Sequence, residues 1–164
     1  MIQTRIAYPE DINMVSAVLA ASWKTAYRGI VNDDYLNSIQ DNHWVAFLIT
    51  GIGNGTIFSM ILESNKNIIG AAIIGKGETD IEANLISFYL LPDKIGRGYG
   101  HTFYSGIEKE LKNRGFSKCV LDVLEHNARA NRFYNSHGFV DINKRITADL
   151  GGYTYTCKVF EKRI

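Results

Sequence analysis

The sequence contains few of the features that mark specialised environments. Its 164 residues include only two prolines and two cysteines, and the formal charge at pH 7 is +1. A charge so close to zero argues against nucleic acid as the main partner, because domains that bind nucleic acid usually carry a basic surface. No apolar run approaches the roughly 20 residues of a membrane-spanning helix, so no membrane association is expected.

Metal and disulfide chemistry are also not indicated. Cys119 and Cys157 both fall in expected strands, which favours two small buried side chains over a disulfide. The histidines lack the spacing of metal ligands, so no metal is expected. The first residues begin a strand-like alternation rather than a signal peptide, and a cytoplasmic protein is therefore expected.

The length and the 46% hydrophobic content are those of one globular domain, expected over residues 1–164. Periodicity predicts strands at residues 2–8, 56–63, 68–75, 85–91, 118–125, 141–149 and 153–161. Helices are expected to begin near residues 9, 32 and 43, after Gly100, and at Asn127. This order predicts an α+β fold with three layers (α/β/α). A mixed, mostly antiparallel sheet forms the central layer and carries helices on both faces.

The most informative segment runs from Tyr89 to Gly100. It reads as the end of a buried strand, a proline, a glycine-rich turn and the start of an amphipathic helix. Such a turn directs several backbone N–H groups outward beside a helix N-terminus, where the helix dipole favours an anion. The segment lacks the Gly-Lys-Ser/Thr ending of a Walker loop and the G-x-G-x-x-G spacing of a dinucleotide loop. It predicts a phosphate site of another kind, with a simple chain reversal as the alternative.

A second segment, residues 127–139, follows the expected strand 118–125. Together the two segments resemble the GNAT family of N-acetyltransferases. The second matches the pattern N-x-x-A-x-x-F-Y-x-x-x-G-F at every fixed position, and the first supplies the glycines of the acetyl-CoA loop Q/R-x-x-G-x-G/A. The resemblance is good over residues 84–139 and looser before them, where residues 23–30 look like a segment of many bacterial members. One position departs from the pattern, because Ile95 stands where the family has Gln or Arg.

The resemblance implies acetyl-CoA as cosubstrate. Backbone N–H groups of residues 96–101 would bind the pyrophosphate, with Arg97 as a replacement for the ligand missing at Ile95. The pantetheine arm would lie like an added strand between the ends of strands 85–91 and 118–125, bonded to the backbone of Leu90 and Leu91. Asn127 would bind the same arm or simply cap its helix, and the side chain of Phe133 is expected to pack in the core. The implied cofactor residues are Leu90, Leu91, Gly96, Arg97, Gly98, Tyr99, Gly100, His101, Asn127, Phe133 and Tyr134.

The resemblance also implies that Tyr134 protonates the departing thiolate. A phenol with a pKa of about 10 suits this task, and an aromatic side chain in the core is the alternative. The base is less evident, because the family's strand glutamate falls by offset on Asn84, which cannot accept a proton. Glu82 lies two residues earlier on the same face and is the candidate. A solvated strand-edge carboxylate and proton removal by bulk water stay open.

The predicted reaction is direct transfer of the acetyl group to a primary amine of a small molecule, with a protein amine also open. Tyr27, Tyr35 and Asn84 are the candidate acceptor-binding residues, because aromatic rings can hold a cationic amine. A non-catalytic module that senses acyl-CoA is the alternative function. A homodimer through the edges of the C-terminal strands is also considered.

Overall fold

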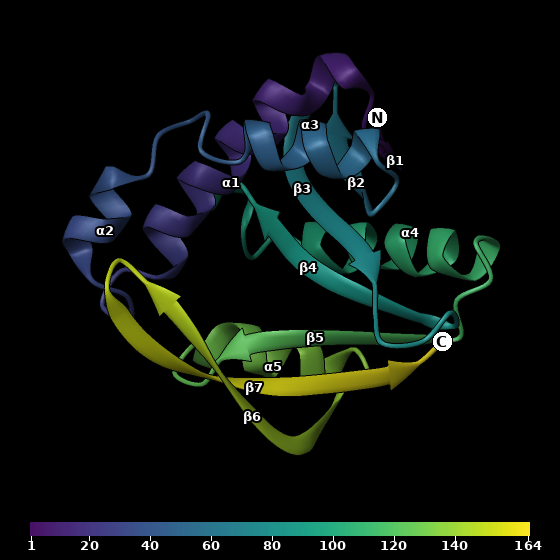
Figure 1. The fold of residues 1–164 in the computed structure, drawn as a ribbon. Helices are drawn as coiled ribbons and strands as arrows, with labels where there is room; N and C mark the ends of the chain where they lie inside the picture. The colour runs from purple at the N-terminus through teal and green to yellow at the C-terminus, as the bar shows by residue number, and fades with distance from the viewer.

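The computed structural model describes all residues, 1–164, and contains one seven-stranded sheet (Figure 1). Its strand order is β1-β2-β3-β4-β5-β7-β6, and every neighbouring pair is antiparallel except β4 and β5. The strands are β1 (Ile2–Ile6), β2 (Ile57–Ser64), β3 (Asn67–Lys76), β4 (Glu82–Leu90), β5 (Lys118–Leu124), β6 (Val140–Leu150) and β7 (Tyr153–Arg163). The predicted mixed, mostly antiparallel sheet is thus confirmed.

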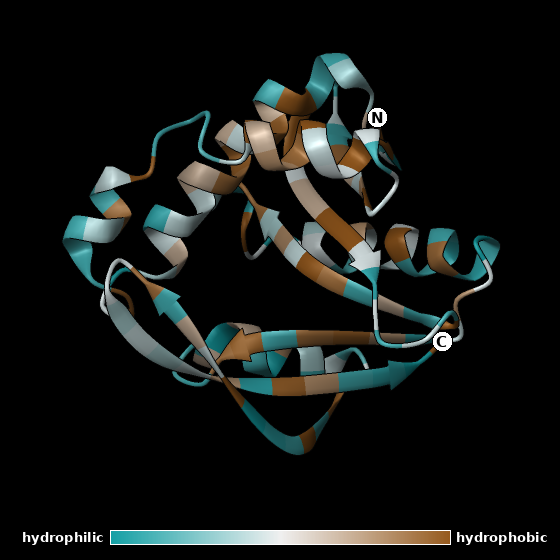
Figure 2. Ribbon diagram, in the orientation of Figure 1, coloured by the Kyte–Doolittle hydropathy of each residue, from teal (hydrophilic) through white to brown (hydrophobic).

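Helices cover both faces of this sheet. They are α1 (Ile12–Ala26), α2 (Asp33–Ser38), α3 (Val45–Gly53), α4 (Tyr99–Asn113) and α5 (Ala128–Ser136), with short 3-10 turns η1 (Pro9–Asp11) and η2 (Pro92–Lys94). One core lies between the sheet and α4, and a second lies between the sheet, α1 and α3. Figure 2 shows that the strands in the middle of the sheet carry long hydrophobic stretches. Such strands are expected where both faces are covered.

Several element ends differ from the sequence prediction for identifiable reasons. The first strand stops at Ile6 rather than at Tyr8, because the Tyr8 N–H donates to Asp11 Oδ2 at 2.8 Å and begins η1. Strand β4 begins at Glu82, three residues earlier than predicted, because residues 82–84 pair with β5. Asn32 caps α2 as expected, accepting a bond from the Tyr35 N–H at 3.1 Å.

The feature that creates the site is the divergence of β4 and β5 (Figure 1). The two parallel strands share only the pairs from Glu82↔Lys118 to Asn84↔Val120. Strand β4 also carries a bulge: successive residues Ile73 and Ile74 of β3 oppose Ser87 and Leu85, so Ile86 is an extra residue. Because a bulge bends and twists its strand, β4 turns away from β5 toward its C-terminal end.

The two cysteines lie in separate cores. Cys119 packs in the core under α4, and Cys157 packs in a cluster with Tyr27 and Leu36 below α1 and α2. Both thiols are buried and unpaired, as predicted. Burial raises the pKa of Cys119 to about 12, so this thiol stays protonated at neutral pH. No helix combines the length and the apolar composition needed to cross a membrane.

Candidate active site

The loop between β4 and α4 presents unused backbone donors. Gly96 and Gly98 have φ angles of +79° and +81°, and a Cβ added at either would meet nothing within 4 Å. Glycine is therefore required there by the backbone conformation and not by lack of space. The N–H groups of residues 96–101 donate no hydrogen bond to the rest of the chain. These six donors precede and begin α4, where an anion is favoured.

A cavity of about 370 Å³ adjoins this loop and extends along the C-terminal end of β4 to α1 and the start of α5. Most of the predicted cofactor residues line it: Leu90, Gly96, Gly98, Gly100, His101, Asn127, Phe133 and Tyr134. Ile95 lines it as well, so an aliphatic side chain occupies the position of the family's polar one. Arg97 is exposed to solvent outside the cavity lining, and Tyr99 packs against the core under α4.

The backbone of Leu90 and that of Leu91 face opposite edges of β4. Leu91 donates its N–H to Ile69 O on β3 at 2.9 Å, so this amide is not available to a ligand. The predicted pairing of the cofactor with the backbone of Leu91 therefore cannot use this N–H. Leu90 stands opposite Gly70, and since strand N–H groups alternate in direction, its N–H points away from β3 into the gap. Its carbonyl accepts a bond from Ser22 Oγ of α1 at 2.8 Å.

Asn127 can cap a helix and bind a ligand at once. Its Oδ1 accepts a bond from the Ala130 N–H at 3.2 Å, which caps α5. The side chain is largely buried and lines the cavity, and its Nδ2 group donates to no protein atom. The two roles that the sequence set against each other therefore use different atoms of one amide.

Tyr134 lies in the wall of the cavity with its ring held by other aromatic side chains. Phe133 and Phe139 contact it edge-on, each with a centroid distance of 5.5 Å. Burial raises the pKa of Tyr134 above its ordinary value, so the phenol keeps its proton at neutral pH. Its hydroxyl makes no hydrogen bond within the protein, which leaves that proton available to a bound molecule.

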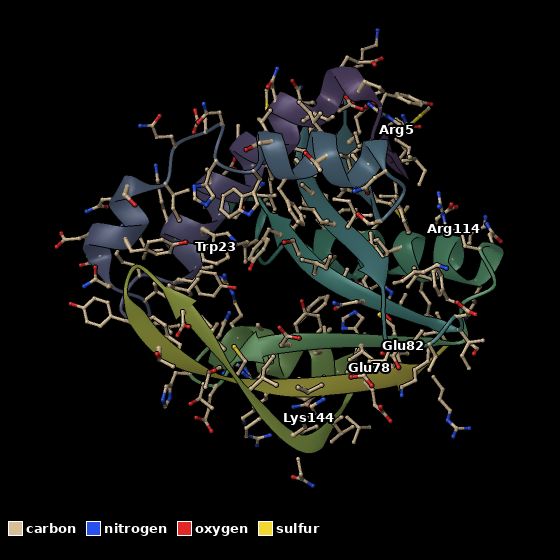
Figure 3. The ribbon with its side chains drawn as sticks, in the orientation of Figure 1. Arg5, Trp23, Glu78, Glu82, Arg114 and Lys144 are labelled. Atoms are coloured by element: carbon tan, nitrogen blue, oxygen red, sulfur yellow. The ribbon has the colours of Figure 1, made fainter.

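A hydrogen-bonded pair of tyrosines lies near Tyr134. The hydroxyls of Tyr27, at the end of α1, and Tyr89, on β4, are hydrogen-bonded to each other. Burial raises the pKa of Tyr27 to about 12, and Tyr89 lines the cavity. The Trp23 ring packs edge-on against Tyr27 at 4.7 Å and tilts against Trp44 at 5.5 Å. Figure 3 shows Trp23 on the α1 side of the gap. Aromatic side chains therefore gather at this end of the sheet.

The sequence matches the Acetyltransferase (GNAT) family over residues 19–139, which include the loop, Asn127 and Tyr134. The chain belongs to the GNAT family. It is accordingly an acetyl-CoA-dependent N-acetyltransferase, and this assignment favours the enzyme over the non-catalytic sensor.

Relatives and solved structures agree with this assignment. A spermidine N(1)-acetyltransferase of Thermoplasma acidophilum is 29% identical over 141 residues, covering 79% of this chain and 83% of the relative. The uncharacterised N-acetyltransferase YuaI of Bacillus subtilis is 27% identical, covering 77% of this chain and 74% of YuaI. The structure of the PaiA N-acetyltransferase of T. acidophilum in complex with coenzyme A has a TM-score of 0.78 and 24% identity, covering 100% of this chain and 99% of that one. This structure supports the fold alone.

The structure does not bring Glu82 to the GNAT cavity. Its carboxylate accepts a bond from the Glu78 N–H at 3.1 Å and pairs with Lys118 Nζ at 3.2 Å. It stands at the start of β4, eight residues before Leu90, and a strand of that length spans roughly 26 Å. Figure 3 shows Glu82 and Glu78 far from Trp23. Glu82 therefore fixes the β3–β4 turn to β5, and its proposed role as base is not supported.

All three predicted acceptor residues also lie outside the cavity lining. Tyr35 packs against the β6–β7 turn, where a Cβ on Gly151 would lie 2.6 Å from the Tyr35 Cβ. Asn84 is the last residue of β4 that pairs with β5. Tyr27 contacts a cavity residue through its bond to Tyr89.

Several lining residues of this GNAT site were not predicted: Ser22, Ala26, Phe88, Tyr89, Arg129 and Ala130. Ser22 and Ala26 are small residues spaced four apart, which places them on one face of α1. That spacing was visible in the sequence, but only the fold shows that this face meets β4.

Proposed function

We propose that this N-acetyltransferase transfers the acetyl group of acetyl-CoA directly to a primary amine of a small cationic molecule. The observation that supports this most strongly is the continuity of the six unused N–H groups with the cavity at the C-terminal end of β4. A phosphate-bearing molecule bound at the loop would extend its arm into that cavity, toward Tyr134.

The residues present fit coenzyme A. The backbone donors of the loop suit the pyrophosphate without a side chain at position 95, and Arg97 contributes positive charge outside the lining. The Leu90 N–H and the Asn127 Nδ2 group suit the amides of the pantetheine arm, and the Phe88 and Phe133 rings stack beside them at 5.4 Å. When bound, acetyl-CoA supplies an activated acetyl thioester. The chain's own contribution is to hold it, exclude water and present the Tyr134 proton.

Tyr134 performs the acid step in this proposal. Its phenol keeps its proton at neutral pH because burial disfavours the phenolate. A thiolate that leaves in the same buried cavity is also desolvated, which raises its basicity, and it takes that proton. No covalent enzyme intermediate is needed, because both cysteines are buried and their pKa values are raised by burial.

A small polyamine-like acceptor is the substrate class that we favour. The relative from T. acidophilum is named for spermidine, and the rings around Tyr27 can attract a cationic amine. We further propose a cytoplasmic enzyme that forms a homodimer. The two chains of this dimer would meet at β6, an edge strand on which Val140 and Ile142 are exposed.

The direct test combines binding and turnover. Calorimetric titration with acetyl-CoA, CoA and ATP should show binding of the first two and none of ATP. A thiol-release assay with spermidine, shorter diamines, an amino sugar and a peptide amine should then show turnover, fastest with the polyamines. Turnover confined to the peptide would refute the small-molecule assignment, and acetyl-CoA binding without turnover on any amine would refute the enzyme.

The glycine loop gives a second prediction. Gly98→Ala should weaken acetyl-CoA binding about five- to thirtyfold, because a left-handed conformation costs an alanine about 1–2 kcal/mol. The loop would relax to negative φ and turn its N–H groups aside. Gly53→Ala is the matched control, since an added Cβ there also meets nothing within 4 Å and Gly53 has no positive φ. Equal affinity of the two variants, measured by calorimetry, would show that the Gly98 backbone does not hold the phosphate.

A further inference from the structure

A single charged residue interrupts the apolar alternation of β5. Cys119, Leu121 and Val123 pack in the core under α4. Because strand side chains alternate, Asp122 points to the opposite face together with Leu124. Leu124 packs there in the cluster that contains Tyr27 and Cys157. Asp122 thus shares a sheet face with the tyrosine pair and not with α4.

Asp122 lies just beyond the point where β4 and β5 part. The last pair between the strands is Asn84↔Val120, so the next residues on this face are Ile86 on β4 and Asp122 on β5. Ile86 is the bulged residue and is 43% exposed. The cofactor cavity is lined by the loop and α5, and also by Ser22 and Ala26 of α1. Asp122 and Ile86 flank the gap on the sheet face opposite α4.

Three other carboxylates in this part of the sheet have a basic partner. Glu82 and Glu161 both pair with Lys118, at 3.2 and 3.0 Å, and Glu125 lies 4.0 Å from Arg145 Nε. Asp122 has no ion pair and no hydrogen bond, although its outer side is open to solvent.

Lys144 on β6 and Cys157 on β7 are the titratable groups that interact with Asp122. Desolvation by the surrounding protein raises the pKa of Asp122, and the positive charge of Lys144 on β6 opposes this. Lys144 is itself engaged with Glu78 at 3.8 Å (Figure 3). On β7, burial raises the pKa of the Cys157 thiol, and the negative charge of Asp122 raises it further. Asp122 is thus a solvent-exposed carboxylate without a protein partner, two residues beyond the last pair between β4 and β5.

We propose that Asp122 receives the reacting amine of the acceptor as an ammonium ion and takes its proton. This assignment rests on the proposed function and supplies the base that Glu82 and Asn84 do not provide. The cationic acceptor would enter from the open face, pair with Asp122, and meet the thioester at the gap between the strands.

The proton and electron balance is complete without a further reactant. One ammonium proton passes to the Asp122 carboxylate, and the nitrogen lone pair forms the C–N bond to the acetyl carbon. The C–S bond breaks with its electron pair on sulfur, which takes the Tyr134 proton. After the C–N bond forms, the nitrogen still carries two protons and gives the second to the Tyr134 phenolate, which restores the phenol. Asp122 then releases its proton to solvent through its exposed side.

The test compares Asp122→Asn and Asp122→Glu with the unaltered chain, using the best amine of the panel. Asp122→Asn should lower kcat about 100-fold or more, the usual contribution of a general base, with acetyl-CoA affinity unchanged within about twofold, a difference of roughly 0.4 kcal/mol. Asp122→Glu should recover part of this rate. The acidic limb of the kcat/KM profile should disappear in Asp122→Asn. Asp80→Asn, which removes a carboxylate that is 98% exposed, is the control and should retain full activity.

Two results would overturn the assignment: an Asp122→Asn variant with kcat near that of the unaltered chain, or one whose acidic limb persists. Absence of turnover by the unaltered chain on every amine would instead refute the proposed function, and the base assignment with it.

Thermal unfolding tests whether the Asp122 carboxylate lacks a partner, and this test does not depend on catalysis. A carboxyl whose pKa is raised on folding destabilises the protein above that pKa, and the cost vanishes below the ordinary value, where both states are protonated. Asp122→Asn should therefore raise the melting temperature at pH 8 and leave it unchanged near pH 3. A lower melting temperature at pH 8 would mean that Asp122 has a stabilising partner, which contradicts the proposal.

Discussion

Replacing Tyr134 by phenylalanine is expected to lower kcat by at least about 100-fold, within the range usual for loss of a general acid. The ring of Tyr134 is held by Phe133 and Phe139, and a phenylalanine ring fills the same space. Only the hydroxyl is lost, and it makes no hydrogen bond that the fold would miss. Acetyl-CoA affinity and thermal stability should therefore change little, and the loss should fall on kcat.

The chain offers a closely matched control for this variant. Tyr104 is also a buried tyrosine, and burial and the nearby Glu108 carboxylate raise its pKa too. It lies on α4 and does not line the cofactor cavity. Tyr104→Phe should retain the wild-type rate in a thiol-release assay at saturating acetyl-CoA. If both variants kept most of their activity, the proton for the leaving thiolate would have to come from water.

The parts of the site that could be predicted from sequence are those that depend on local backbone chemistry. The positive φ angles of Gly96 and Gly98 and the cap at Asn127 each involve a few consecutive residues. Glycine and asparagine are among the few residues that meet these local demands. The loop and the start of α5 therefore carried enough information on their own to indicate the cofactor site.

The incorrect predictions depend on distant segments of the chain. Whether Leu90 or Leu91 presents its N–H to the gap is set by the register with β3, and a one-residue change reverses the answer. Glu82 faces Lys118 because β4 and β5 are still paired at that point. Asp122 was not among the predicted residues, because only the divergence of the two strands gives it an opening.

Truncating Phe103 to alanine should produce the largest loss of stability among the variants considered. Phe103 is fully buried at the centre of the core under α4 and stacks on Phe88 of β4 at 5.3 Å. A Phe-to-Ala change in a core typically costs about 3–5 kcal/mol, against a total stability of about 5–15 kcal/mol for a domain. Urea denaturation should show this as a lower midpoint with an unchanged slope.

The same substitution tests how the loop is held. Phe103 lies one turn into α4, so its contact with Phe88 ties the phosphate loop to the strand that borders the cavity. Saturating acetyl-CoA should therefore restore part of the lost stability, by about 2.7 kcal/mol at one hundred times the Kd. Phe47→Ala on α3, where the side chain is 46% exposed, should cost less than about 0.5 kcal/mol. A Phe103→Ala variant as stable as Phe47→Ala would mean that α4 can shift to fill the space, and the affinity for acetyl-CoA should then fall, because the loop would move with the helix.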